Sequence, residues 1–449
     1  MVVQSSGGQS GVQIVESIPI EVEQLPVAAL KPYELNARTH SAGNVRKLAK
    51  SLKASSYFSP ILIDENNVIV AGHGRWLAAQ LLGMTHVPVI RKGDLSEAQK
   101  RALRLADNKI QGGWNPVLLA EELNFLIAED FDLSLTGFDT IEVDKLCTPS
   151  IDGEELDEPL PEPPASPVTR PGDEWALGRH KIICGNSLER SVYDRLLWGK
   201  KADAAFVDVP FNVPIAGHVS GNGRVQHDEF QFASGEMSRS EFRAFLITSL
   251  THLRDNSRDG ALLYICSDWR MIAILITAGE ELGLKLLNII VWVKPNPALG
   301  SMYRSQYELV AVFKHGTARH TNNIMLGRMG RNRSNVWQHD GASGFSKSRE
   351  QILKFHPTTK PLQLVIDAIR DATQPGDLII DSFGGSGTTL LAAELSGRRA
   401  SLIEIEPKYV DVTLRRFQAR TGVEPLLVPG MTPFSIVKQQ RAAMEGADS

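Results

Sequence analysis

The sequence has few cysteines and no apolar run of membrane length. Its 449 residues include only three cysteines, which are far apart and show no metal-ligand spacing, so neither a disulfide framework nor a metal site is expected. The longest apolar run, residues 284–293, is interrupted by a lysine and an asparagine. It is far shorter than the roughly 20 residues that cross a bilayer. The sequence therefore predicts no membrane partner.

The chain also lacks an excess of charge of one sign. Its formal net charge is −4, so any surface that binds nucleic acid must be a local basic patch. Residues 1–11 lack the basic start and apolar core of a secretory signal, which predicts a cytoplasmic protein. With 42% hydrophobic and 22% charged residues, the composition is that of a globular protein, and the length predicts more than one domain.

A proline-rich acidic stretch divides the chain. Such a composition cannot bury a core and favours an extended conformation, so residues 148–172 are predicted to be a linker between domains at 15–147 and 173–425. In the first domain, the apolar runs 61–63 and 68–70 flank an Asn pair, which predicts a hairpin. Helical patterns follow at 75–82 and 96–108. We expect a small α/β domain.

Beyond the linker, short apolar strands alternate with helical patterns. This alternation is typical of a doubly wound parallel α/β sheet, in which ligands bind at the carboxyl ends of the strands. The predicted segments are 204–207, 242–253, 261–265, 271–282, 287–293, 309–313, 362–372, 378–380, 388–395 and 400–403.

A glycine-rich loop follows the predicted strand 378–380. The loop, residues 381–389, reads Asp-Ser-Phe-Gly-Gly-Ser-Gly-Thr-Thr and leads into a helix, so its backbone can approach a ligand closely. Glu404 ends the next strand, where a carboxylate can accept both hydroxyls of a ribose. The loop lacks the Gly-Lys-Ser/Thr of a P-loop, which favours a nucleoside over a triphosphate. The alternative is a tight turn that only closes an α/β unit.

An acidic turn, Asp208-Val209-Pro210-Phe211, follows the predicted strand 204–207. The exocyclic amine of a base is a poor nucleophile, because its lone pair is delocalised into the ring. Asp208 and a backbone carbonyl of the turn could accept hydrogen bonds from this amine and offset the positive charge that develops on it. Phe211 could stack on the base. By itself, this sequence would more commonly be a turn without function.

Together the two loops resemble the β class of DNA amino-methyltransferases, from residue 173 to about 420. In this family the catalytic turn precedes the cofactor loop, as here. Further matches are Trp292-Val293-Lys294-Pro295, Asn335-Val336-Trp337, residues 356–361 (His-Pro-Thr-Thr-Lys-Pro) and Ile403-Glu404. The resemblance implies a Rossmann-like domain that transfers a methyl group from S-adenosylmethionine to N6 of adenine in DNA. Because a base inside a duplex cannot reach such a pocket, it also implies a flipped base in double-stranded DNA.

The resemblance assigns roles to individual residues. The catalytic turn would be Asp208, Val209, Pro210 and Phe211. The cofactor would contact Asn186, Lys360, Asp381, Phe383, Gly384, Gly385, Gly387, Thr388 and Glu404. Three positions depart from the family pattern: Val209 replaces proline, Phe211 replaces tyrosine and Asn186 replaces aspartate. Each keeps the group that its role requires: a backbone carbonyl, an aromatic face and an acceptor oxygen.

The main basic stretch lies between the catalytic and cofactor loops. It resembles a target-recognition region, about 314–355, and basic loops suit phosphate contacts. The predicted DNA-binding residues are Arg319, Arg328, Arg331 and Arg333. The alternative is a solvated loop. Residues 217–223, which are rich in glycine, could form a lid or an ordinary loop.

The N-terminal domain resembles the ParB N-terminal domain through Asn36-Ala37-Arg38 and residues 70–79. In that family the second segment holds nucleotide phosphates. Gly72 and Arg75 match this segment and are candidate nucleotide contacts, whereas His73 and Gly74 do not match. A domain that only binds DNA or positions the catalytic domain fits the sequence equally well. A homodimer is also compatible with it.

Other functions remain open at this stage. An N4-cytosine methyltransferase uses the same amino chemistry, although the family typically has serine in place of Asp208 for that target. A cytosine-C5 enzyme needs a nucleophilic thiolate, and no cysteine here follows a proline as in such enzymes. A catalytically weak, partition-like DNA-binding protein would explain the altered turn. It would not explain why Asp208, the glycines and Glu404 are kept.

Overall fold

The computed structural model describes residues 21–55, 59–108, 113–147, 160–212, 236–297, 302–324, 333–339 and 360–447. The chain forms two compact units, and the boundary between them in the sequence lies between Phe138 and Asp139. This boundary lies one helix earlier than the predicted start of the linker at residue 148. Among the described residues, no helix is both long enough and apolar enough to cross a membrane.

The first unit contains a small four-stranded sheet in the order β1-β5-β3-β4. Strands β3 and β4 form the predicted antiparallel hairpin, with Asn67 in the left-handed region at φ 62°. The strands are β1 (Glu23–Pro26), β3 (Ile61–Ile63), β4 (Ile69–Ala71) and β5 (His86–Arg91), and a separate pair joins β2 (Arg38–Thr39) to β6 (Gly113–Trp114).

The helices of this unit begin at recognisable caps. Ser96 and Gln99 bond reciprocally at the start of α3, and Asn115 accepts two backbone N–H groups at the start of α4. The helices are α1 (Ala42–Ser55), α2 (His73–Leu81), α3 (Glu97–Asn108) and α4 (Pro116–Ala128), with short 3₁₀ turns at Val27–Ala29 and Leu133–Thr136. The predicted helices at 75–82 and 96–108 correspond to α2 and α3.

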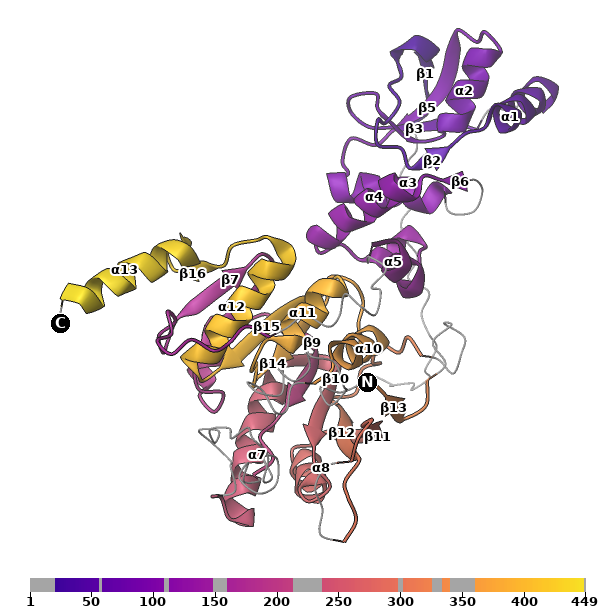
Figure 1. Cartoon of the computed structure of the whole chain (residues 1–449). Helices are drawn as coiled ribbons and strands as arrows, with labels where there is room; N and C mark the ends of the chain where they lie inside the picture. Colours follow the sequence, from indigo (N-terminus) through magenta and orange to yellow (C-terminus); the bar gives the residue numbers. More distant parts are fainter. Residues whose placement is uncertain are drawn as a thin grey trace, which may run out of the picture. The chain divides into compact units, whose positions relative to one another are not determined.

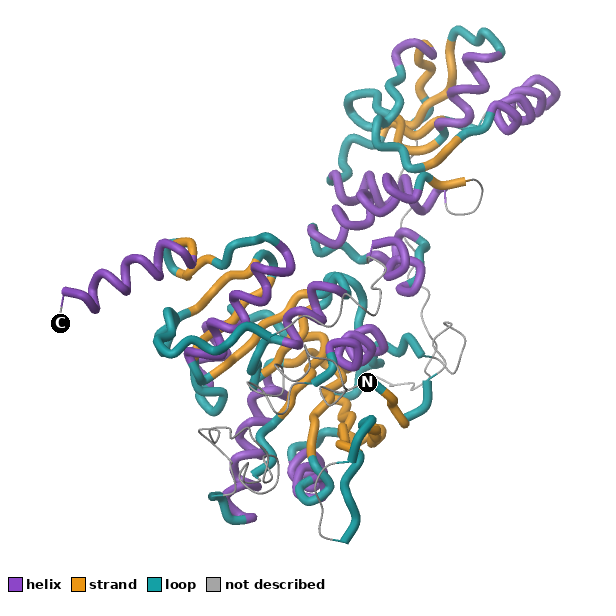
Figure 2. The backbone as a smooth tube through the Cα atoms, viewed as in Figure 1, coloured by secondary structure: helices purple, strands orange, loops and turns teal. Residues whose placement is uncertain are grey.

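The second unit is built on an eleven-stranded sheet in the order β13-β11-β12-β10-β9-β14-β15-β8-β7-β16-β17 (Figures 1 and 2). Its strands are β7 (Glu174–Leu177), β8 (His180–Cys184), β9 (Ala202–Asp208), β10 (Ser257–Ser267), β11 (Lys285–Val293), β12 (Tyr307–Lys314), β13 (Val336–Gln338), β14 (Leu378–Asp381), β15 (Arg399–Glu404), β16 (Leu426–Val428) and β17 (Thr432–Pro433).

The central strands β10, β9, β14, β15 and β8 are parallel, as the sequence predicts. We call the edge at which they end the carboxyl edge, and the opposite edge the amino edge. The prediction of a fully parallel sheet is wrong for the outer strands. Strand β12 is antiparallel to both β10 and β11, and β7 is antiparallel to β8. The sheet is therefore mixed.

Helices cover both faces of this sheet, which confirms the doubly wound α/β fold. Apolar residues of α10 (Leu362–Ala372), α11 (Thr388–Leu395) and α12 (Pro407–Thr421) share one buried core with the strands. Those of α6 (Arg190–Leu197), α7 (Arg239–Asp255) and α8 (Ile272–Glu281) share the other. The unit also contains α5 (Thr140–Cys147) and a final helix, α13 (Phe434–Ala447).

The end of the predicted linker packs against the second unit. The Asp411 carboxylate on α12 accepts hydrogen bonds from the backbone N–H groups of Val168 and Thr169, and Leu160 and Val168 are buried. Residues 148–159 lie outside the described residues. On its other side, α5 belongs to the second unit because buried Asp144 pairs with buried Arg398. The extended linker prediction thus does not hold for residues 160–172.

Candidate active site

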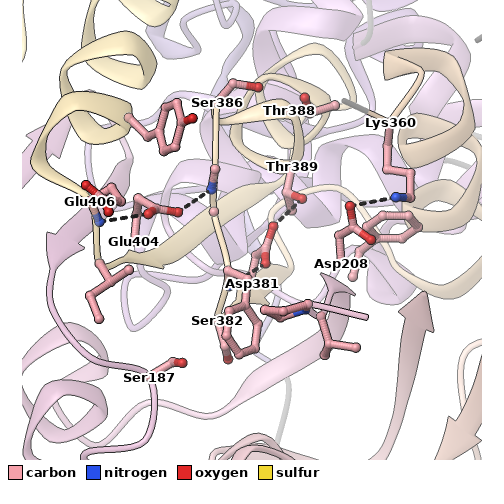
Figure 3. Close-up of a pocket in the computed structure, with 18 of the residues that line it drawn as sticks. Ser187, Asp208, Lys360, Asp381, Ser382, Ser386, Thr388, Thr389, Glu404 and Glu406 are labelled. Atoms are coloured by element: carbon pink, nitrogen blue, oxygen red, sulfur yellow. Dashed lines mark hydrogen bonds and ion pairs between the residues drawn. The ribbon is translucent and has the colours of Figure 1, made fainter. Parts of the chain in front are cut away.

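A cavity of about 210 Å³ lies at the carboxyl edge, where β8, β9, β14 and β15 end (Figure 3). This is where a doubly wound sheet places its ligand crevice. Most of the predicted catalytic and cofactor residues line it, although they come from distant parts of the chain. These lining residues are Asn186, Asp208, Val209, Pro210, Phe211, Lys360, Asp381, Phe383, Gly384, Gly385, Thr388 and Glu404.

Asp381 ties the glycine loop to the end of β14. Its Oδ1 accepts a hydrogen bond from the Phe383 backbone N–H at 3.0 Å, and its Oδ2 accepts one from the Thr389 hydroxyl at 2.6 Å. Burial raises the pKa of the Asp381 carboxyl to about 7. The carboxylate therefore shapes the loop that faces the cavity, in addition to lining it.

The glycines of the loop have different roles. Gly385 and Gly387 adopt left-handed conformations at φ 51° and 80°, which favour glycine. A Cβ on Gly387 would also lie 2.5 Å from the Thr413 side chain of α12. Gly387 does not line the cavity, and its missing side chain leaves room for Thr413, so it allows α11 to pack on α12. The sequence could not distinguish these roles.

Glu404 at the end of β15 faces the loop from the opposite side. Its Oε2 accepts a hydrogen bond from the Gly385 N–H at 2.7 Å and its Oε1 one from the Glu406 N–H at 2.8 Å. Each carboxylate oxygen retains a further acceptor position, so the group can still receive two hydroxyl donors. Burial raises the pKa of Glu404 to about 7.

Asn186 extends the same side of the cavity beyond β8. Its Oδ1 accepts a hydrogen bond from the Leu188 N–H at 3.0 Å and keeps a second lone pair. Other cavity residues were missed by the sequence analysis; they include Ser187, Phe245, Glu406, Lys408 and Tyr409. Glu406 and Tyr409 follow a predicted strand end, and this position is the signal that could have indicated them.

Asp208 and Lys360 form an ion pair on the other side of the cavity. The Lys360 ammonium lies 2.6 Å from Asp208 Oδ2 and 3.0 Å from Glu308 Oε2, and Lys294 pairs with the same glutamate. Burial raises the pKa of the Asp208 carboxyl, and the Lys360 charge opposes this shift. Both carboxylates raise the pKa of Lys360, which keeps the ammonium charged. Lys360, predicted as a cofactor contact, thus directly holds Asp208.

The second oxygen of Asp208 has no such partner. Asp208 Oδ1 is buried and makes no hydrogen bond to any described residue. Leaving a buried acceptor unsatisfied costs about 1–3 kcal/mol, so an atom of this kind indicates a place for a donor from a ligand. The turn residues Val209, Pro210 and Phe211 line the adjoining wall, and the Lys360 ammonium lies 5.4 Å from the centre of the Phe211 ring.

The two predicted DNA-binding arginines that the structure describes, Arg319 and Arg333, do not line this cavity. Arg319 lies at the amino edge of the sheet. Its carbonyl is next to Gly260, and the N–H of the preceding Ala318 donates a hydrogen bond to Asp259; both partners are near the start of β10. At about 3.3 Å per residue, this point is roughly 20 Å from the end of the strand. Arg333 pairs with Asp367 of α10 at 2.6 Å. Arg328, Arg331 and the glycine-rich segment 217–223 lie outside the described residues.

The two candidate nucleotide contacts of the first unit, Gly72 and Arg75, lie at the turn between β4 and α2. Gly72 adopts φ 103° before α2, and a Cβ there would lie 2.8 Å from the Arg75 guanidinium, so the arginine lies over the turn. His73 is buried, and its Nε2 accepts a hydrogen bond from the Tyr33 N–H at 3.2 Å. Burial lowers the pKa of His73 to about 4. This histidine is therefore a neutral acceptor inside the first unit.

Three family models match the chain: "DNA methylase" over residues 202–415, "ParB N-terminal domain" over 13–109 and "ParB-methyltransferase HTH domain" over 117–171. The ParB-like nuclease domain-containing protein YnaK of Escherichia coli K12 is 44% identical over 82 residues, which are 18% of this chain and 94% of YnaK. The type II methyltransferase M2.MboI of Moraxella bovis is 28% identical over 232 residues, 49% of this chain and 82% of M2.MboI.

The chain is also similar, over part of its length, to two solved structures. The PvuII cytosine-N4-specific DNA methyltransferase has a TM-score of 0.42 and 17% identity, and the match covers 59% of this chain and 92% of that one. M1.HpyAVI has a TM-score of 0.38 and 20% identity, and the match covers 52% of this chain and 96% of that one.

Proposed function

We propose that this chain, which belongs to the N6/N4 DNA methylase family and carries a ParB-like N-terminal domain, methylates N6 of adenine in DNA. The methyl donor is S-adenosylmethionine, which supplies an electrophilic methyl group on a sulfonium. The observation that carries the proposal is the buried Asp208 Oδ1, which lines the cavity and has no partner among the described residues.

The amino group of the target base is held by acceptors. Asp208 Oδ1 accepts a hydrogen bond from one N–H, and a backbone carbonyl of the turn after Asp208 accepts one from the other. Both would draw electron density back onto nitrogen, which would attack the methyl carbon while sulfur leaves with the electron pair of the carbon–sulfur bond; the methylated nitrogen would then release one of its two protons. Lys360 holds Oδ2 at 2.6 Å and so fixes the direction in which Oδ1 points. Phe211 supplies an aromatic face for the flipped base.

The other half of the cavity fits the nucleoside part of the donor. Glu404 accepts hydrogen bonds from the ribose hydroxyls, for which it has free acceptor positions beside the Gly385 and Glu406 N–H groups. The second lone pair of Asn186 Oδ1 accepts from the adenine amine of the donor. Gly384 and Gly385 line the cavity without side chains, so the donor can lie against the backbone.

We favour adenine over cytosine as the target because this chain has Asp208 in the catalytic turn. N4-cytosine enzymes of the β class of DNA amino-methyltransferases typically have serine at that position. The deciding experiment is to incubate the protein with methyl-labelled S-adenosylmethionine and unmodified DNA, digest the DNA to nucleosides and identify the labelled product by mass spectrometry. N6-methyladenine supports the proposal, and N4-methylcytosine overturns its choice of target. Absence of label, with intact DNA binding, would favour a catalytically inactive DNA-binding protein.

For the N-terminal domain we propose binding of a nucleoside triphosphate at the turn before α2. The left-handed Gly72 exposes backbone N–H groups at the start of the helix, and the Arg75 guanidinium lies over them. Calorimetric titration with CTP should show binding that Arg75→Ala weakens by about tenfold, as expected for loss of a charge-assisted contact. No heat of binding in the parent protein would contradict this site.

A further inference from the structure

Three large apolar side chains are mostly exposed in two loops of the second unit. Trp269, Met302 and Tyr303 have exposed fractions of 53%, 82% and 81%. We call these residues the apolar rim. Single exposed apolar residues are common, whereas several large ones in neighbouring loops at one edge of a sheet are candidates for a surface that contacts a partner.

Strand register places the rim at the carboxyl edge. Cys266 of β10 pairs with Asp208 of β9, and Trp269 follows Cys266 by only a few residues. Tyr307 at the start of β12 pairs with Val293 at the end of β11, so Met302 and Tyr303 lie in the connection beyond that edge. Both loops therefore border the side of the sheet that carries Asp208.

Cationic side chains accompany the rim. The Arg270 guanidinium lies 5.6 Å from the Trp269 ring and pairs with Asp268 at 3.3 Å. Arg304, next to Tyr303, is exposed and donates a hydrogen bond to the Pro297 carbonyl. Aromatic and thioether groups beside arginines suit a ligand with flat apolar faces and a phosphate backbone, which favours DNA over a second protein copy.

We propose that the apolar rim inserts into the DNA next to the target base and occupies the space that the flipped base leaves in the stack. The inference rests on the proposed function, since a base that reaches Asp208 must leave the duplex. Apolar wedges that enter between base steps stabilise such distorted DNA, because they replace the lost stacking contacts. The rim thus has a different role from the phosphate-contacting arginines predicted from sequence.

The test compares two tryptophans on opposite edges. Trp269→Ala and the double variant M302A/Y303A remove the rim. Trp198→Ala, the control, removes a tryptophan side chain that is even more exposed than Trp269 (72%) and lies between α6 and β9 at the amino edge. The substrates are two duplexes that contain the sequence found methylated in host DNA. In one the target base is paired, and in the other an abasic site stands opposite it. Methyl transfer under single-turnover conditions is the first readout.

The rim variants should transfer methyl groups to the paired duplex at least about tenfold more slowly than the parent, which corresponds to one lost stacking contact. On the abasic duplex, where the target is already unpaired, they should match the parent within about twofold. A fluorescent 2-aminopurine at the target position should brighten with the parent and with Trp198→Ala, and much less with the rim variants.

Equal losses on both duplexes, or rates equal to the parent on the paired one, would overturn the proposal. So would a change from dimer to monomer in light scattering that accounts for the loss, because the rim would then contact a second copy of the chain. If the parent itself labels neither duplex, the proposed function fails. If the parent is active, the outcomes named above test the rim proposal separately from the proposed function.

Discussion

At the amino edge of the sheet, Asp203 and Asp377 lie on or beside β9 and β14, the strands whose other ends carry Asp208 and Asp381. Asp203 Oδ1 accepts a hydrogen bond from Arg258 at 2.7 Å, and its Oδ2 one from the Leu378 N–H at 2.8 Å. Thus the amino-edge Asp203 uses both oxygens within the protein, whereas Oδ1 of the carboxyl-edge Asp208 is buried and bonds to no described residue.

The pKa shifts alone would not separate the two edges. Burial raises the pKa of Asp377 at the amino edge and of Asp381 at the carboxyl edge to about 7 in both cases. Neither residue touches the reacting atoms in the proposed mechanism. A perturbed carboxylate is therefore a weaker indicator of catalysis here than an unsatisfied buried acceptor that faces a cavity.

The amino edge also holds the unit together. Arg398, directly before β15, donates hydrogen bonds to Asp144 of α5 and to the Thr373 carbonyl at the end of α10. The opposite end of β15 carries Glu404, which faces the cavity. Substitutions at the amino edge should therefore change stability and spare the chemistry, and those at the carboxyl edge should do the reverse.

The largest effect is expected from Asp144→Ala. It would leave the fully buried Arg398 guanidinium without its carboxylate, and breaking a buried ion pair typically costs about 3–5 kcal/mol. Urea unfolding should show this loss in the free energy of unfolding of the second unit. Turnover per folded molecule should equal that of the parent. Lys145→Ala, an exposed change on the same helix, is the control. A loss below about 1 kcal/mol would mean that α5 is not anchored as described.

The second prediction concerns Asp208→Ala. Loss of a preorganised acceptor should lower turnover by about 10²–10³. Affinity for S-adenosylmethionine should stay near that of the parent, since Asp208 acts on the base and not on the donor. Asp203→Ala is the matched change on the same strand: it should lower the unfolding midpoint and retain turnover. Equal turnover losses in the two variants would remove the proposed distinction between the edges.

Much of the fold could be predicted from sequence where local signals are strong. The helix over 362–372 begins directly after a proline and the one over 388–395 directly after a glycine, and both have the predicted bounds. The antiparallel direction of β12 could not be predicted. Strand direction depends on which distant strands pair, and the apolar pattern of 309–313 is the same for either direction.

In the candidate site too, contacts between residues far apart in the sequence could not be predicted. Asp208 and Glu404 could be predicted because each ends an apolar strand beside a distinctive turn. Glu308 could not be connected to them, although it is a charged residue near the start of an apolar strand, because its partner Lys360 is far away in sequence. Spacing within one segment carries no information on such contacts. For the same reason the ion pair of Arg333 with Asp367 of α10 could not be predicted.

A third and smaller effect should follow from Glu404→Gln. Loss of the charged acceptor should weaken S-adenosylmethionine binding by about tenfold. Since burial raises the pKa of Glu404 from 4.5 to about 7, and ionised Glu404 is the better acceptor, the affinity of the parent should rise between pH 6 and 8. The affinity of the variant should lack this part of the pH dependence. Calorimetry at pH 6, 7 and 8 measures both, and parallel pH profiles would contradict the role of Glu404.

The stability of the cofactor-free protein should change in the opposite direction. With its pKa raised on folding, Glu404 binds more protons in the folded state between pH 4.5 and about 7, so its contribution to stability falls as pH rises through that range. Relative to Glu404→Gln, the parent should therefore lose unfolding free energy from pH 5 to 7 and then remain level. The Glu404 charge also contributes to the raised pKa of Asp381, so Asp381 should titrate at a lower pH in the variant than in the parent.

The smallest effect is expected from Arg319→Ala. A residue that contacts a DNA phosphate contributes about one counterion to the salt dependence of binding, so its removal makes the plot of log affinity against log salt shallower by about one unit. Arg319 lies at the amino edge, roughly 20 Å along β10 from the edge that carries Asp208. We therefore expect the same slope as in the parent. Arg304→Ala, at the apolar rim, should reduce the slope. Binding curves at several salt concentrations separate the two variants; a shallower slope for Arg319→Ala alone would place DNA on the amino edge and reverse the comparison between the two edges.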